Sequence, residues 1–138
     1  MNRNDFKLLS NIRLREARIL LDNNCFEGAF YLAGYSVECA LKACIAKNVR
    51  KYDFPDKKTV NDSYSHDLEK LIKTAGLGPI FDAEINANPD FALNWAVVKD
   101  WNEETRYLNP ISQARANDLF SAITTRNNGV ITWLKRFW

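Results

Sequence analysis

The stretch "FEGAFYLAGYSVECALKACIAKN", residues Phe26–Asn48, decides the fold class of this chain. Its apolar residues recur at helical spacing along the whole stretch. Small residues also recur there, and they would let neighbouring helices approach closely: Gly28, Ala29, Ala33, Gly34, Ala40 and Ala43. Because apolar and aromatic residues occupy nearly the whole circumference, the sequence predicts a central helix with partners on several faces.

The segments before and after this stretch are also predicted to be helical. Helical periodicity or helix-start signals mark residues 5–21, 65–75, 80–86, 91–101 and 111–137. The last segment is predicted to be one long helix that starts after Pro110 and bends near residues 127–129. By contrast, Pro55 and several Asp and Asn residues predict an exposed connection over residues 49–64.

The overall pattern predicts an all-α protein. No segment alternates apolar and polar residues with the period of a β-strand. Each amphipathic helix must bury its apolar stripe against neighbours, so the predicted architecture is an antiparallel up-and-down helical bundle. It would have four to five main helices with short accessory helices, in a single domain over residues 1–138.

The composition excludes several classes of protein. Of the 138 residues, 46% are hydrophobic and 26% are charged, which is the balance of a globular domain and not of a disordered chain. Glu38 and Lys42 interrupt the longest apolar run, so no membrane-spanning segment is expected. Three cysteines without a metal-ligating spacing, in a chain with no secretory signal at its start, favour a reduced cytoplasmic compartment. No metal and no cofactor are expected.

The charged residues are unevenly distributed, although the formal net charge is only +2. Basic residues gather in the first predicted helix and in residues 42–58, a region that includes Arg50 and Lys51. Residues 80–104 carry six carboxylates and one lysine. Such a surface either binds a polyanion on its basic side, makes head-to-tail contacts, or is simply solvated.

Glu38 is the first candidate site residue, because it is a carboxylate among apolar neighbours in the central helix. A buried carboxylate needs a partner, and Lys42 follows it in the favourable Glu-before-Lys orientation of a helical ion pair. Arg106 is a second candidate partner. The favoured interpretation is an ion pair that fixes helix packing, and the alternative is a functional carboxylate in a cleft.

Three further polar residues are candidates for a site. Arg106 and Tyr107 follow an acidic pair at a predicted turn, where they form either a clamp between helices or a pair that binds an anion. His66 lies at a predicted helix start, where Ser65 or His66 itself would be the N-cap. We interpret His66 as structural, because a lone histidine without paired cysteines does not form a metal site.

Four stretches, in this order, give the chain a family resemblance: "LAGYSVECALKACIAKN", "SHDLEKLIKTAGL", "DWNEETRYL" and the final "VITWLKRF". Together they resemble the HEPN family of small helical-bundle proteins over most of the chain. The resemblance implies an up-and-down α-bundle that commonly dimerises. Members of that family include ribonuclease toxins paired with nucleotidyltransferase antitoxins, and others that look like nucleotide-binding or scaffold modules.

The active ribonucleases of the HEPN family carry an arginine followed, after four to six residues, by a histidine. The single histidine here is His66, and no arginine stands at that spacing before it. Arg126 begins a similar stretch, "RNNGVIT", but Thr132 stands where a histidine would be needed. Because threonine cannot act as a general base near neutral pH, the ribonuclease motif is absent.

Two hypotheses for the function follow. The first is a non-catalytic HEPN-like module that binds a nucleotide or RNA, or pairs with a nucleotidyltransferase-type partner as in toxin–antitoxin systems. The second is a metal-independent ribonuclease whose site is rebuilt from Arg106, Arg126 and His66 across a dimer cleft. Both assume a homodimer, whose self-complementary patch would include residues left uncovered in the monomer: Tyr31, Leu32, Tyr35 and Trp138.

Overall fold

The structure is a computed structural model that describes residues 1–49, 53–107 and 110–138. Within these ranges it contains helices, turns and bends but no β-strand, so the all-α prediction is confirmed. In chain order the helices are α1 (Arg3–Asp22), α2 (Phe26–Asn48), α3 (Lys57–Ser63), α4 (Leu68–Thr74), α5 (Gly78–Ala87), α6 (Pro89–Val98), the 3₁₀ helix η1 (Glu103–Tyr107), α7 (Gln113–Thr124) and α8 (Val130–Leu134).

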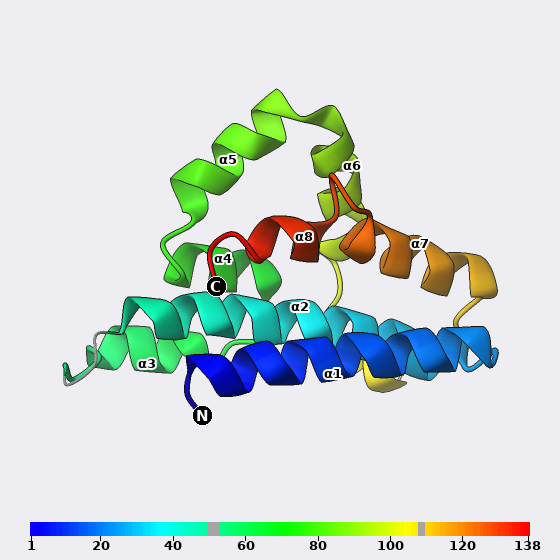
Figure 1. Ribbon diagram of the computed structural model, residues 1–138, viewed down its shortest axis with the longest axis horizontal. Coiled ribbons are helices and arrows are strands. Elements are labelled where there is room, and N and C mark those ends of the chain that lie inside the picture. Colours follow the sequence, from blue (N-terminus) through cyan, green and yellow to red (C-terminus); the bar gives the residue numbers. More distant parts are fainter. Residues whose placement is uncertain (50–52, 108–109) are drawn as a thin grey trace.

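α1 and α2 form a long antiparallel hairpin along one side of the molecule (Figure 1). α1 starts with a capping box, in which the Asn2 side chain accepts the backbone N–H of Asp5 and the Asp5 carboxylate accepts the backbone N–H of Asn2. The turn after α1 contains Asn24 at φ 61°, a left-handed conformation that asparagine tolerates better than most residues. α2 therefore returns alongside α1.

α2 is the central element of the fold, as predicted, because it contacts α1, α4, η1, α7 and α8. Its buried residues include two polar ones, Ser36 and Glu38. The main-chain oxygen of Ser36 accepts a hydrogen bond of 2.7 Å from the buried hydroxyl of Ser10, which ties α2 to α1. By length and composition α2 could also cross a membrane, but 72% of its most apolar 18-residue stretch is buried inside the fold. Its apolar composition therefore matches its role as a core helix.

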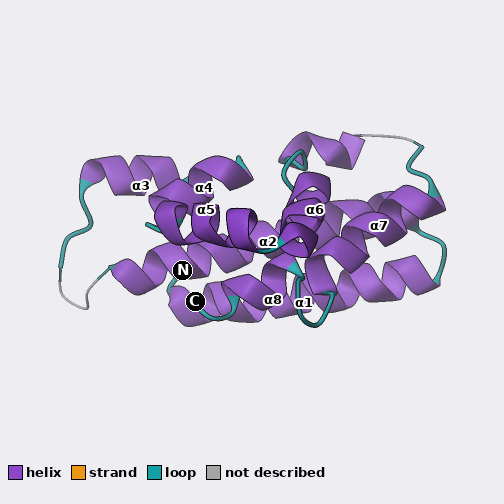
Figure 2. Ribbon diagram, turned by 90° about the horizontal axis from the view of Figure 1, so that it is seen from above, coloured by secondary structure: helices purple, strands orange, loops and turns teal. Residues whose placement is uncertain are grey.

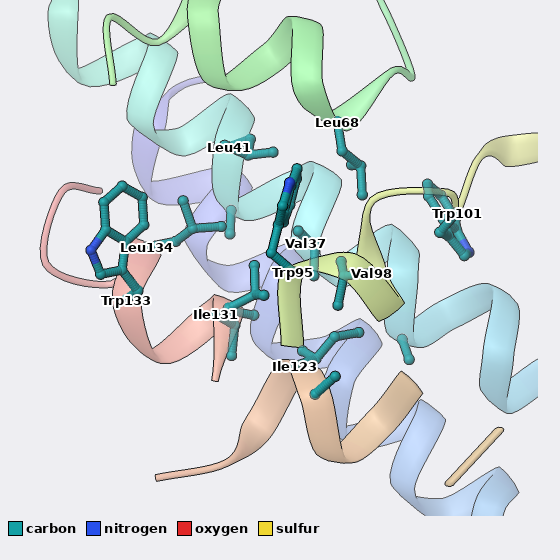
Figure 3. Close-up of a cluster of buried hydrophobic side chains, with 14 of the residues drawn as sticks. Val37, Leu41, Leu68, Trp95, Val98, Trp101, Ile123, Ile131, Trp133 and Leu134 are labelled. Atoms are coloured by element: carbon teal, nitrogen blue, oxygen red, sulfur yellow. The ribbon is translucent and has the colours of Figure 1, made fainter. Parts of the chain in front are cut away.

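The remaining helices pack around α2 and build the core. α7 and α8 lie along α2, and α5 and α6 extend farther from the hairpin (Figure 1). Seen from above, α3 lies at one end of the molecule and α7 toward the other (Figure 2). The core side chains come from five helices (Figure 3): Val37, Leu41, Leu68, Trp95, Val98, Ile123, Ile131 and Leu134. Burial of each large apolar side chain contributes about 1.5–3 kcal/mol, which holds these helices together. The up-and-down order of the bundle stays a prediction.

The last part of the chain, predicted as one long helix, consists of the two helices α7 and α8. α7 starts at Gln113 with Ser112 as its N-cap, and the helical path stops after Thr124. A Cβ atom on Gly129 would lie 2.5 Å from the main-chain oxygen of Thr125, so this tight turn requires glycine. The prediction of a continuous helix was wrong because the apolar spacing runs on through the turn.

The connection over residues 49–64 was also predicted incorrectly in part, because it contains α3. The Asp56 side chain caps this helix by accepting hydrogen bonds from the backbone N–H of Thr59 at 2.9 Å and from its hydroxyl at 2.6 Å. A short helix that buries none of its residues has no periodic apolar signal, which explains the error. Arg50 and Lys51 of the predicted basic region lie outside the described residues.

Candidate functional site

The side chain of Trp101 packs directly against the central helix α2 and so holds the segment after α6 in place. α6 ends at Val98, three residues before the predicted end at Trp101. A Cβ atom on Gly34 would lie only 2.2 Å from Nε1 of Trp101, so the indole ring rests on the backbone of α2. Tyr31 stacks on the same ring with a centroid distance of 6.0 Å. This contact positions residues 99–103 beside the start of α4 and so forms one wall of a groove.

A polar cluster lies one turn beyond this contact, around Glu38. This carboxylate is 1% exposed, and its Oε1 atom is 2.9 Å from Nζ of Lys42 and 2.9 Å from Nδ1 of His66. An ionised carboxylate only accepts hydrogen bonds, so Nδ1 of His66 is the donor and its Nε2 atom is left for other partners. The second carboxylate oxygen, Oε2, is buried with no hydrogen-bond partner among the described residues.

His66 reaches this carboxylate because of how α4 begins. The N-cap of α4 is Asp67, whose Oδ1 atom accepts the backbone N–H of Lys70 at 3.1 Å, so the prediction of Ser65 or His66 as the cap was wrong. The hydroxyl of Ser65 accepts the backbone N–H of Asp67 at 3.1 Å. These two bonds fix the turn before α4, and the imidazole of His66 points from this turn toward Glu38.

His66, whose side chain is 45% exposed, lines a groove of about 510 Å³ between the start of α4 and residues 99–103. Four carboxylates line this groove, against one lysine and one histidine: Asp67, Glu69, Asp100 and Glu103, with Lys99 and His66. Excess negative charge in a concave surface attracts cations and repels phosphates. The groove therefore suits a cationic or neutral ligand better than a nucleic acid.

Arg106 and Tyr107 lie elsewhere, at the exposed end of η1. The guanidinium of Arg106 lies over the ring of Tyr107, 4.8 Å from its centroid, and hydrogen bonding to Tyr107 raises the pKa of Arg106 above its usual value. Arg126 is exposed in the turn between α7 and α8. None of the hydrogen bonds or ion pairs formed by the described residues joins either arginine to Glu38 or His66.

In the part of the chain that the structure describes, no group of three or more His, Cys, Asp or Glu side chains is arranged so that it could hold a metal ion. Cys25 is exposed, whereas Cys39 and Cys44 are buried in α2. Burial raises the pKa of the Cys39 thiol to about 12, with a further contribution from the charge of Glu38. Burial alone raises the pKa of Cys44 to about 11, and both thiols therefore stay protonated at neutral pH.

These raised pKa values predict a loss of stability at alkaline pH. The thiols ionise near pH 9.0 in the unfolded chain, so above that pH the unfolded state releases protons that the folded state keeps. Each thiol should then lower the free energy of unfolding by about 1.4 kcal/mol per pH unit. The free energy of unfolding, measured with urea, should fall between about pH 8 and pH 10 by about 2–3 kcal/mol more in the natural chain than in Cys39→Ala/Cys44→Ala. An identical pH dependence in the two proteins would contradict this result.

Comparison of the chain with known protein families, with characterised proteins and with solved structures found no match. The Glu38 cluster and the acidic groove are therefore the features on which a function can be based.

Proposed function

We propose that this protein is a non-catalytic HEPN-like binding or interaction module, active as a cytoplasmic homodimer with an up-and-down bundle core. The observation that carries the proposal is the set of groups that its single histidine contacts. Nδ1 of His66 is bound to a buried carboxylate that Lys42 shares, and no described arginine joins this group. A ribonuclease of the resembled type needs an arginine beside its histidine, so binding is the better supported role.

A protein partner of the nucleotidyltransferase type fits the groove better than a nucleotide. The carboxylates of the groove would repel phosphate groups, whereas lysine and arginine side chains of a protein would be attracted. A nucleotide or RNA would find more favourable charge on α1, where Lys7 and Arg15 have no carboxylate partner among the described residues. Co-purification with the product of an adjacent nucleotidyltransferase gene would test the preferred partner.

The surface of α1 supports the homodimer. Only Ser10 and Ala17 of this helix are buried, whereas Leu8 is 61% exposed and Ile19 is 54% exposed. These two residues are separated by about three helical turns, so their side chains lie on one face of α1. A second chain that covered both side chains would remove exposed apolar surface from water. A solution mass of one chain at micromolar concentration would contradict this part of the proposal.

A metal-independent ribonuclease is the second candidate, and one observation favours it. The bond between Nδ1 of His66 and the buried Glu38 orients the imidazole, and His66 is also one of the residues that line the groove. Histidines held by a carboxylate in this way can act as general bases through Nε2. Arg106 or Arg126 would then have to come from a second subunit.

Incubation of the purified protein with total RNA in the presence of a chelator separates the two candidates. We expect the RNA to stay intact, because the acidic groove repels it and no arginine among the described residues lies beside His66 to stabilise a phosphorane-like charge. Cleavage that is lost in His66→Ala, and also in Arg106→Ala or Arg126→Ala, would overturn the non-catalytic proposal. Cleavage that persists equally in all three variants would come from a contaminating nuclease.

A further inference from the structure

A second pocket, of about 400 Å³, lies between α2 and α3 and has mainly apolar walls. Its volume is in the range of about 300–1,000 Å³ that small-molecule sites occupy. Its apolar lining includes residues from three helices and their C-caps: Phe6 from α1, Ile45 and the C-cap Val49 from α2, and Val60 and the C-cap Tyr64 from α3. Lys42 of α2 also lines the pocket.

Large apolar side chains in contact with solvent gather at this pocket. Met1, Val49 and Tyr64 all line it, and all three are among the exposed large hydrophobic residues of the chain. Phe54, which is almost fully exposed, directly precedes the lining residue Pro55. Apolar surface gathered around a concavity costs free energy in water, and an apolar ligand would recover part of it.

Among the described residues that line this pocket, Lys42 has the one charged side chain. Its side chain is 15% exposed, and one of its ammonium protons is used by Oε1 of Glu38. An ammonium group has three donors, so two remain for a ligand. Lys42 can keep its bond to Glu38 while it donates a second ammonium proton to a ligand, so the buried carboxylate keeps both of its partners.

We propose that this pocket binds an amphipathic monocarboxylate, with the class of medium-chain fatty acids as its best fit. The alkyl chain would lie against Ile45, Val49 and Val60, and the carboxylate would accept a hydrogen bond from Lys42. Charge complementarity selects this class, since an alkyl alcohol lacks the charge and an alkylammonium has the wrong sign. This inference does not depend on the proposed partner or on ribonuclease activity.

Isothermal titration calorimetry with decanoate, decanol and decyltrimethylammonium tests the proposal on the full chain. We expect decanoate to bind in a 1:1 complex, decanol to bind about ten-fold or more weakly, and decyltrimethylammonium not to bind. The charge-neutral variant Glu38→Gln/Lys42→Met should lose the preference for decanoate over decanol. Equal affinity for decanoate and decanol in the natural protein would overturn the proposal.

Two matched substitutions show whether this pocket is the binding site. Ala46→Trp adds bulk to the pocket lining and should abolish decanoate binding, whereas Ala96→Trp on the exposed surface of α6 should leave it unchanged. Thermal unfolding of both variants confirms that they are folded. Retained binding in Ala46→Trp would overturn the assignment. Absence of decanoate binding in the natural chain, with a dimer that Ala46→Trp converts to a monomer, would identify the pocket as a protein interface instead.

Discussion

Gly34→Ala is expected to lower the free energy of unfolding by about 3–5 kcal/mol, a cost similar to removal of a buried tryptophan side chain. The added Cβ would lie 2.2 Å from Nε1 and 2.3 Å from Cδ1 of Trp101, well inside van der Waals contact. Because Gly34 is in the middle of α2, its backbone cannot move without disturbing the core, so the indole ring must be displaced from the backbone of α2. Urea unfolding followed by tryptophan fluorescence measures the lost stability.

Two controls isolate the contact between Gly34 and Trp101. Gly78→Ala, at a position where a Cβ would meet nothing within 4 Å, should be neutral or stabilise by up to about 1 kcal/mol. In a Trp101→Ala background, Gly34→Ala should cost almost nothing, because the clash has been removed and alanine favours the helix. A full cost for Gly34→Ala in that background would show that some other contact is responsible.

Lys42→Met is expected to lower the free energy of unfolding by about 3–5 kcal/mol, because it removes one partner of a buried carboxylate. Glu38 would keep only the hydrogen bond from His66, and its Oε2 atom is already without a partner among the described residues. Taking an ionised group out of water with incomplete compensation is costly, so the substitution should destabilise the folded state, in which Glu38 is buried, more than the unfolded state. Urea unfolding near neutral pH measures the difference.

Lys58→Met is the matched control for this experiment. Lys58 forms an ion pair with Asp62 at the same 2.9 Å distance and the same helical spacing, but its side chain is 87% exposed. Its loss should cost far less than the loss of Lys42, because water and salt screen an exposed ion pair. The double variant Glu38→Gln/Lys42→Met should recover most of the stability that Lys42→Met loses, since no buried charge remains. Equal costs for Lys42→Met and Lys58→Met would show that Glu38 is stable without its ion pair.

The features that local sequence determines were predicted well. Apolar residues along Phe26–Asn48 follow the helical period, and this alone indicates a helix that other elements cover on most sides. The same reasoning failed where a helix is short or where the spacing runs on through a turn, as in α3 and at Gly129. The ion pair between Glu38 and Lys42 also lies within one helix, so its spacing could be read directly from the sequence.

Contacts between distant residues could not be predicted in this way. Gly34 was identified as a place where a helix could approach closely, but the group that occupies it is Trp101, from a segment outside any helix. No spacing rule connects His66 to Glu38, and the sequence alone suggested Arg106 as the additional partner. Rotation of the imidazole toward α2 depends on how α4 packs, which local propensity does not encode.

The sequence by itself determined the helical class, the central position of α2 and the absence of the arginine–histidine motif, because these depend on residue types and on periods within one segment. Only the tertiary structure decided that His66 shares a buried carboxylate with Lys42 and that an acidic groove and an apolar pocket are separate. Those features arise where helices far apart in the chain pack together, and packing is set by the shapes and charges of several elements at once.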